Sequence, residues 1–163
     1  NISKVNSLNN TDINIKYRIY DTPGQILLQD QAKLFIPGSS AVIIMYAIDS
    51  KKSFKKAKEW LTYLDNYGKG YDGIVLIGNK SDLNTKSINY EDANNLATEN
   101  DAKFIQISCK QNININILVK YLNKKTKKKL EKKMNTTPSI PESNRVILNE
   151  WEFVAIQKQN NCC

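Results

Sequence analysis

Short apolar runs rich in β-branched residues alternate along this chain with segments whose apolar residues recur at helical spacing. The runs at residues 41–48 and 74–78 have the length and continuous apolar character of strands that are buried on both faces. Helical spacing follows the first run between residues 54 and 64, and it follows the second run at residues 90–99. Because parallel strands need a crossover connection, usually a helix, this alternation predicts an α/β fold with a mostly parallel sheet and flanking helices.

Further elements are predicted on either side of this central part. Residues 2–8 and 13–20 indicate a hairpin with a turn at 9–12, and residues 104–107 indicate another strand. The last helix is expected at residues 112–133. Its first residues alternate strictly, as in a strand, but the helical pattern continues beyond them. The apolar face of this helix is expected to consist of Ile113, Ile117, Leu118, Tyr121 and Leu122.

The composition excludes several kinds of site. The chain of 163 residues has no histidine, which excludes Ser-His and Cys-His catalysis, and its three cysteines argue against a zinc site. No apolar run reaches the roughly 18 residues of a membrane span, and no secretory signal is visible. These observations favour one globular domain with a tail.

The positive charge is concentrated towards the end of the chain. Of the net charge of +8, residues 1–123 carry +3 and residues 124–163 carry +5, with seven lysines at 124–133. These lysines can form a solvated helix end, where cations also suit the macrodipole, or attract anionic lipid. No aromatic residue interleaves them, so we expect no nucleic-acid partner.

A polar motif directly follows the second strand of the predicted hairpin. Asp21, Gly24 and Gln25 place a carboxylate, a glycine and an amide at the end of an alternating strand. A nucleotide γ-phosphate site needs a carboxylate near Mg²⁺, a bare backbone N–H for a phosphate oxygen, and an amide that orients a water. Taken alone, the motif is equally compatible with an ordinary turn.

A second motif follows the buried run at 74–78, at the strand end where α/β folds bind ligands. Its functional side chains are Asn79, Lys80 and Asp82. A carboxylate there can accept two N–H bonds from the Watson–Crick edge of guanine, a pair that adenine does not offer. Asn79 can bond base atoms or tie neighbouring loops, and the stem of Lys80 can lie on the base face.

A third motif, Ser108-Cys109-Lys110, ends the run at 104–107, where a backbone N–H can donate to guanine O6. In this order, the three motifs resemble D-x-x-G-Q, N-K-x-D and S-A-K of the small GTPases of the Ras superfamily. The resemblance covers roughly residues 1–133 and implies a small-GTPase (P-loop NTPase) sheet with flanking helices.

The resemblance also implies roles for these residues in binding GTP or GDP with Mg²⁺. Asp21 would hold Mg²⁺ through water, Gly24 would bond the γ-phosphate, and Gln25 would be the catalytic residue that places the attacking water. Cys109 replaces a small Ala and is expected to be a buried, inert thiol. The guanine pocket would consist of Asn79, Lys80, Asp82, Ser108, Cys109 and Lys110.

One expected motif of the family is not found. None of the six glycines supplies the phosphate loop G-x-x-x-x-G-K-[ST], and the first residues of the chain already resemble the family's second strand. The first strand, which is central in the family's sheet, and the first helix are therefore expected to be lacking, which leaves two inner strand edges unpaired. Either the sequence is a fragment or incomplete gene model, or it is a degenerate relative that binds no nucleotide. In both cases we expect weak or absent GTP binding by these 163 residues.

The end of the chain carries a further match. Cys162 and Cys163 stand where the Rab branch of the family carries its double geranylgeranylation site. Residues 134–163 are therefore expected to be a hypervariable, prenylated tail, disordered or extended, behind a truncated GTPase domain at 1–133. The apolar islands at 146–148 and 151–156 either dock on a partner, such as a prenylation escort protein, or pack back on the domain as a strand or helix.

The resemblance implies a membrane-trafficking switch that hydrolyses GTP in the complete protein. Its location would be the cytoplasmic face of intracellular membranes, with a cytosolic pool when bound to a GDP dissociation inhibitor. Other implied partners are membrane lipid, an escort protein with geranylgeranyl transferase, an exchange factor, a GTPase-activating protein and effectors. The alternative is a lipid-anchored interaction module that binds no nucleotide.

Overall fold

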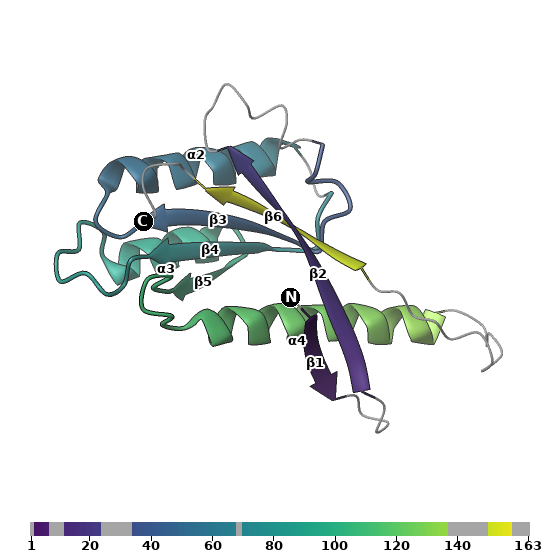
Figure 1. Ribbon diagram of the computed structural model, residues 1–163. Coiled ribbons are helices and arrows are strands. Elements are labelled where there is room, and N and C mark those ends of the chain that lie inside the picture. Colours follow the sequence, from purple (N-terminus) through teal and green to yellow (C-terminus); the bar gives the residue numbers. More distant parts are fainter. Residues whose placement is uncertain (1, 7–11, 24–33, 68–69, 137–149, 158–163) are drawn as a thin grey trace.

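The structure, a computed structural model, describes residues 2–6, 12–23, 34–67, 70–136 and 150–157 (Figure 1). The six strands form one sheet in the order β1-β2-β6-β3-β4-β5. β1 pairs with β2 in antiparallel fashion, as the predicted hairpin requires, and all other pairs are parallel. This confirms the predicted α/β class. The strands are β1 Ile2–Asn6, β2 Asp12–Pro23, β3 Ala41–Ala47, β4 Ile74–Asn79, β5 Ala102–Gln106 and β6 Glu150–Gln157.

Within the described residues, three helices cover the two faces of the sheet: α2 (Lys51–Tyr67), α3 (Tyr90–Glu99) and α4 (Ile115–Thr136). The helical stripe predicted in α2 is buried in one apolar cluster together with residues of α3 and with alternate residues of β3 and β4. The other residues of these strands pack in a second cluster, to which α4 contributes Leu122. The continuous apolar runs thus fill both faces of a central sheet, as the sequence predicts. The buried stripe of α2 comprises Phe54, Ala57, Trp60, Leu61 and Leu64.

The start of the last helix differs from the prediction. α4 begins at Ile115, not at Asn112, because Asn112 and Asn114 have the positive φ angles of 56° and 59° that asparagine tolerates better than most residues. Asn114 Nδ2 donates to the Gln106 carbonyl at 2.9 Å, which fixes this turn against the end of β5. Ile113 forms a β-bridge with Ser108 and is 37% exposed, so it is not part of a helical core face.

The rest of the predicted face of α4 is divided. Ile117 is 46% exposed, whereas Leu122 is buried and Leu118 and Tyr121 pack against the second cluster. Residues 112–114 therefore form a turn with one isolated bridge, and the predicted helical pattern holds from Ile115 onward.

The largest departure concerns the tail. Residues 150–157 were expected within a disordered or extended segment, but they form β6, which lies between β2 and β3 and runs parallel to both (Figure 1). The two inner strand edges predicted to lack partners are both paired with β6. The alternative of an apolar island that packs back on the domain as a strand is the one observed. The run Phe153-Val154-Ala155-Ile156 has the continuous apolar character of a central parallel strand.

Candidate functional site

The polar motifs of the sequence meet at the carboxyl ends of β4 and β5. The two strands are neighbours in parallel register, with Gly78 opposite Gln106. Beyond the strands the backbones stay tied, because Ile107 N–H donates to the Gly78 carbonyl at 2.9 Å and Ser81 N–H donates to the Ile107 carbonyl at 3.0 Å. The second and third motifs therefore form one continuous edge.

Asn79 joins the two loops. Its side chain is buried, and its Oδ1 accepts from the backbone N–H of Lys80 at 2.7 Å and from that of Cys109 at 3.1 Å. Its backbone carbonyl accepts from Ile48 N–H at 3.1 Å, at the end of β3. Of the two roles that the sequence left open for Asn79, the structure supports the one that ties neighbouring loops.

Asp82 is held by Ser108. Ser108 Oγ donates to Asp82 Oδ1 at 2.5 Å, and the same oxygen accepts from the Gln111 N–H at 3.0 Å. Ser108 is fully buried, which fixes the position of its hydroxyl. The hydrogen bond from Ser108 lowers the pKa of the Asp82 carboxyl below its ordinary value, and the nearby charges of Lys110 and Lys80 act in the same direction. Asp82 is therefore an ionised, pre-oriented acceptor at neutral pH.

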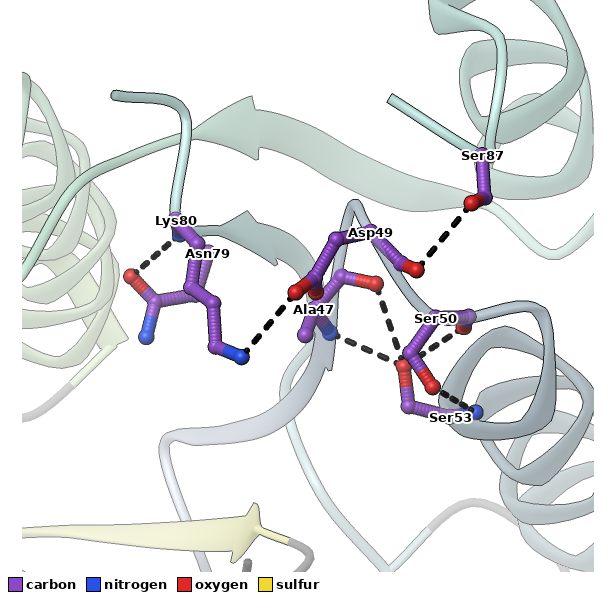
Figure 2. A network of polar contacts seen from close by, with 7 residues as sticks. All are labelled: Ala47, Asp49, Ser50, Ser53, Asn79, Lys80 and Ser87. Carbon is purple, nitrogen blue, oxygen red and sulfur yellow. Dashed lines mark hydrogen bonds and ion pairs between the residues drawn. The ribbon is translucent and has the colours of Figure 1, made fainter. Parts of the chain in front are cut away.

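Lys80 has an unusual backbone and a partner that the sequence reasoning missed. Its φ of 67° lies in the left-handed region, and its Nζ lies 3.3 Å from Asp49 Oδ2 (Figure 2). Asp49 is the second residue after β3, the strand next to β4, and it directly follows the apolar run predicted at 41–48. A carboxylate at the end of a neighbouring predicted strand was therefore the signal that could have found it. The ion pair holds the lysine stem across the gap between two adjacent strand ends.

The loop that carries Asp49 is itself fixed by hydroxyl groups (Figure 2). Ser50 caps α2, since its Oγ accepts from the Ser53 N–H at 3.2 Å. Ser53 Oγ accepts from the Ala47 N–H at 3.0 Å and lies 2.8 Å from the Ser50 carbonyl, which accepts its hydrogen. Ser87 Oγ donates to the Asp49 carbonyl at 3.1 Å. The ends of β3 and β4 are thus joined through α2 and the loop before α3.

Two residues of the third motif lie on the surface. Cys109 is exposed, so the expectation of a buried thiol is wrong. The physical reason is that its backbone N–H, not its side chain, turns inward to reach Asn79. Lys110 is also exposed, and its charge contributes to the lowered pKa of Asp82.

Asp21 lies apart from this group. It is exposed on β2, where it is level with Ala155 of β6 and, through that strand, with Ile43 of β3. Asn79 is level with Ala47, four residues further along β3. Two strands, β6 and β3, separate β2 from β4, which corresponds to about 14 Å across the sheet. The structure therefore unites the second and third motifs and leaves the first at a distance.

Several predicted site residues lie outside the described residues. These are Gly24, Gln25, Cys162 and Cys163. Within the described ranges, no group of three or more His, Cys, Asp or Glu side chains is arranged to hold a metal ion. Mg²⁺ is commonly bound by one or two carboxylates together with nucleotide phosphates and water, so the exposed carboxylate of Asp21 fits such a role. None of the helices in the described part of the chain is long and apolar enough to cross a membrane.

Comparisons with known proteins agree with these observations. Residues 2–128 match the sequence model of the Ras family. The chain is similar to the Ras-related protein Rab-5A of Dictyostelium discoideum, with 33% identity over 153 residues, which cover 93% of this chain and 73% of that protein. It is also similar to the Ras-related protein RHN1 of Nicotiana plumbaginifolia, with 35% identity over 105 residues, which cover 64% of this chain and 52% of that protein. The chain therefore spans about half the length of the second relative.

Proposed function

The chain belongs to the Ras superfamily of small GTPases, in its Rab branch, and from this premise we propose that it binds guanine nucleotide and serves as a membrane-trafficking switch. The observation that carries the proposal is the ionised Asp82 carboxylate, held by Ser108 beside a loop that Asn79 ties in place. Such an acceptor is fixed before any ligand arrives, which reduces the cost of ordering it on binding.

Guanine recognition is supported by the hydrogen-bond acceptors that remain available on Asp82. An ionised carboxylate has several acceptor sites, and Ser108 uses one oxygen of Asp82, so the other oxygen can accept N–H bonds from a base edge. Asn79 Oδ1 accepts from the backbone N–H groups of Lys80 and Cys109, so Asn79 serves to hold the loops. Lys80 forms an ion pair with Asp49, and its stem can lie along an aromatic base.

The phosphate end of the site is assigned on the resemblance and on the exposed position of Asp21. In the proposed role, Asp21 binds Mg²⁺ through water, Gly24 donates its N–H to the γ-phosphate, and Gln25 orients the attacking water. Bound Mg²⁺ would neutralise phosphate charge during hydrolysis. Lys110 would remain a surface cation beside the base end, where its charge adds to the effect of the Ser108 hydrogen bond in lowering the pKa of Asp82.

Membrane attachment is proposed through the final two cysteines. Cys162 and Cys163 would carry geranylgeranyl groups, and two lipid chains give stable anchoring where one chain gives only marginal binding. The lysines at 124–133 would add attraction to anionic lipid. The escort protein, transferase, dissociation inhibitor, exchange factor, activating protein and effectors of Rab proteins are the corresponding proposed partners.

A second candidate function is a lipid-anchored interaction module without a nucleotide cycle. One observation favours it: β6 occupies the place between β2 and β3, so a further strand cannot pair there at the same time. In that case the base-end geometry would be retained without a working phosphate site.

The test is a comparison of GDP with ADP on the 163-residue chain in the presence of Mg²⁺. We expect millimolar GDP to shift the NMR signals of the Asn79, Asp82 and Ser108 amides, and an equal concentration of ADP to leave them unchanged. Equal shifts with both nucleotides would contradict guanine recognition. The absence of shifts with either nucleotide would contradict base recognition by this edge of the 163-residue chain.

A further inference from the structure

β6 is the connection between two parts of the sheet. Among the described strands, β2 pairs with β1 and β6, and β3 pairs with β4 and β6, whereas β2 and β3 do not pair with each other. Eight residues of β6, from Glu150 to Gln157, are in register with β2, and four, from Phe153 to Ile156, are in register with β3. Removal of this strand would leave a hairpin and a separate three-stranded sheet.

The register of β6 also decides where Asp21 lies. Asp21 is level with Ile43 only because each of them is opposite Ala155. A strand rises about 3.3 Å per residue, so a slip of two residues on either side of β6 would move Asp21 by about 7 Å relative to β3. A slip of one residue would place every side chain of the hairpin on the opposite face of the sheet.

Side-chain contacts also hold β2 at several points. Ile15 is buried in the second cluster, Tyr17 forms a hydrogen bond with Asn123 of α4, and Tyr20 stacks on Phe35 with ring centroids 4.6 Å apart. Ile19, which is opposite Phe153 of β6, is 61% exposed. Thr22, next to Asp21, is buried as well, so side-chain contacts and the backbone pairing of β6 together align this end of β2 with the sheet.

The strand is attached to the domain on one side by residues 137–149, which follow the end of α4 at Thr136. Thirteen residues can span up to about 45 Å when fully extended, so the length of this connection alone does not define one position for the strand. What keeps it there is the pairing of its backbone with two neighbours, in the manner of a strand added to an open sheet edge. The tether raises its effective concentration at that position.

We propose that residues 150–157 act as a tethered strand that docks between β2 and β3 and sets the register of the two parts of the sheet. A ligand that captures the C-terminal tail would withdraw β6 and release the hairpin from the rest of the sheet. By linkage, anything that binds across β2 and β3 would in turn strengthen the docking of β6. The role of Asp21 at a nucleotide rests on the proposed function, but the role of β6 does not.

The experiment is amide hydrogen exchange without nucleotide on the full chain and on the variant Val154→Pro. Proline removes a backbone donor and is not tolerated in a central strand, so it should dislodge β6. We expect exchange at residues 17–22 and 41–44 to increase together by at least tenfold, while β5 keeps its protection. Ser143→Pro, in a segment that already contains two prolines, is the matched control and should exchange like the natural chain. Unchanged protection of β2 and β3 in Val154→Pro would overturn the proposal.

A second variant decides the question if Val154→Pro unfolds throughout. Ile43→Cys with Ala155→Cys, in a chain whose three natural cysteines are replaced by Ser, joins two residues that are opposite each other. Neighbouring strands lie about 4.8 Å apart, which a disulfide can bridge. We expect the disulfide to form and the oxidised protein to exchange the β2 amides at least tenfold more slowly than the reduced protein. Ile43→Cys with Ile156→Cys, one residue out of register, should not cross-link. Equal cross-linking of the two pairs, or equal exchange in the two redox states, would contradict the proposal.

Discussion

The two parts of the sheet are built in different ways. β3, β4 and β5 come from one continuous stretch of the chain, and side chains such as Asn79 and Ser108 tie the loops at their ends. The part made of β1, β2 and β6 combines residues 2–23 with residues 150–157, and β6 joins it to β3. The part made of β3, β4 and β5, which we call the braced part, is therefore local and tied by side chains at its strand ends. The part made of β1, β2 and β6, which we call the inserted part, depends on a strand from the far end of the chain.

This difference predicts which part of the sheet should open at the lower free energy. Contacts between residues far apart in sequence form only after a large loop has closed, which costs entropy before any contact is gained. A segment held mainly by one inserted strand is expected to open at a lower free energy than a sheet with a buried core on both faces. The site follows the same division, since Asp82 lies on the braced part and Asp21 on the inserted part.

The largest expected effect is a cavity in the braced part. Ile77 of β4 is fully buried in the second cluster, and Ile77→Ala should lower the free energy of unfolding by about 4 kcal/mol. Ile117→Ala, on a residue of α4 that is 46% exposed, is the matched control and should cost less than about 1 kcal/mol. Urea denaturation followed by circular dichroism measures both. Equal losses would mean that β4 is not the centre of the cooperative core.

The next effect concerns the brace itself. Asn79→Ala removes the acceptor of two backbone N–H groups, those of Lys80 and Cys109, and should lower the free energy of unfolding by about 3 kcal/mol. Asn95→Ala, at an exposed position of α3, should leave it nearly unchanged. If the two variants unfold at the same urea concentration, the loops at the ends of β4 and β5 are not held by Asn79.

A third prediction separates the two parts by their ligands. Asp82→Asn replaces an acceptor by a group that also donates, so it should lower GTP affinity by about 30-fold, or about 2 kcal/mol, and shift preference towards xanthine nucleotides. The matched variant Asp21→Asn, on the inserted part, should weaken Mg²⁺-dependent binding without changing the preference among bases. Competition binding measures both affinities, with the two variants made in a form of this protein to which a phosphate loop has been added. Full GTP affinity in Asp82→Asn would refute the guanine assignment.

The same division explains what could be predicted from the sequence. The strands at 41–47 and 74–79 and the helix at 90–99 were predictable because their signals are local: an apolar run or a helical stripe that ends at a polar motif. The pairing of β6 was not, because its partners lie more than 100 residues away and its eight residues indicate only an apolar island. The exposure of Cys109 was also missed, since which atom of a residue turns inward depends on the opposing loop.

The smallest predicted effect tests how the braced part tunes its carboxylate. The hydrogen bond from Ser108 lowers the pKa of Asp82, so Ser108→Ala should raise that pKa towards the ordinary value of about 3.9. A carboxyl whose pKa is lower in the folded state contributes stability above its unfolded pKa and loses it as the pH falls through the folded pKa. Below about pH 4 the natural chain should therefore lose stability more steeply than Ser108→Ala. NMR titration of the Asp82 carboxyl carbon measures the shift.

Ser81→Ala is the control, because Ser81 Oγ has no hydrogen-bond partner within the described residues. In the Ser81→Ala variant, Asp82 should titrate as in the natural chain. An identical pKa in Ser108→Ala would show that the surrounding lysines, not the hydroxyl, keep Asp82 ionised.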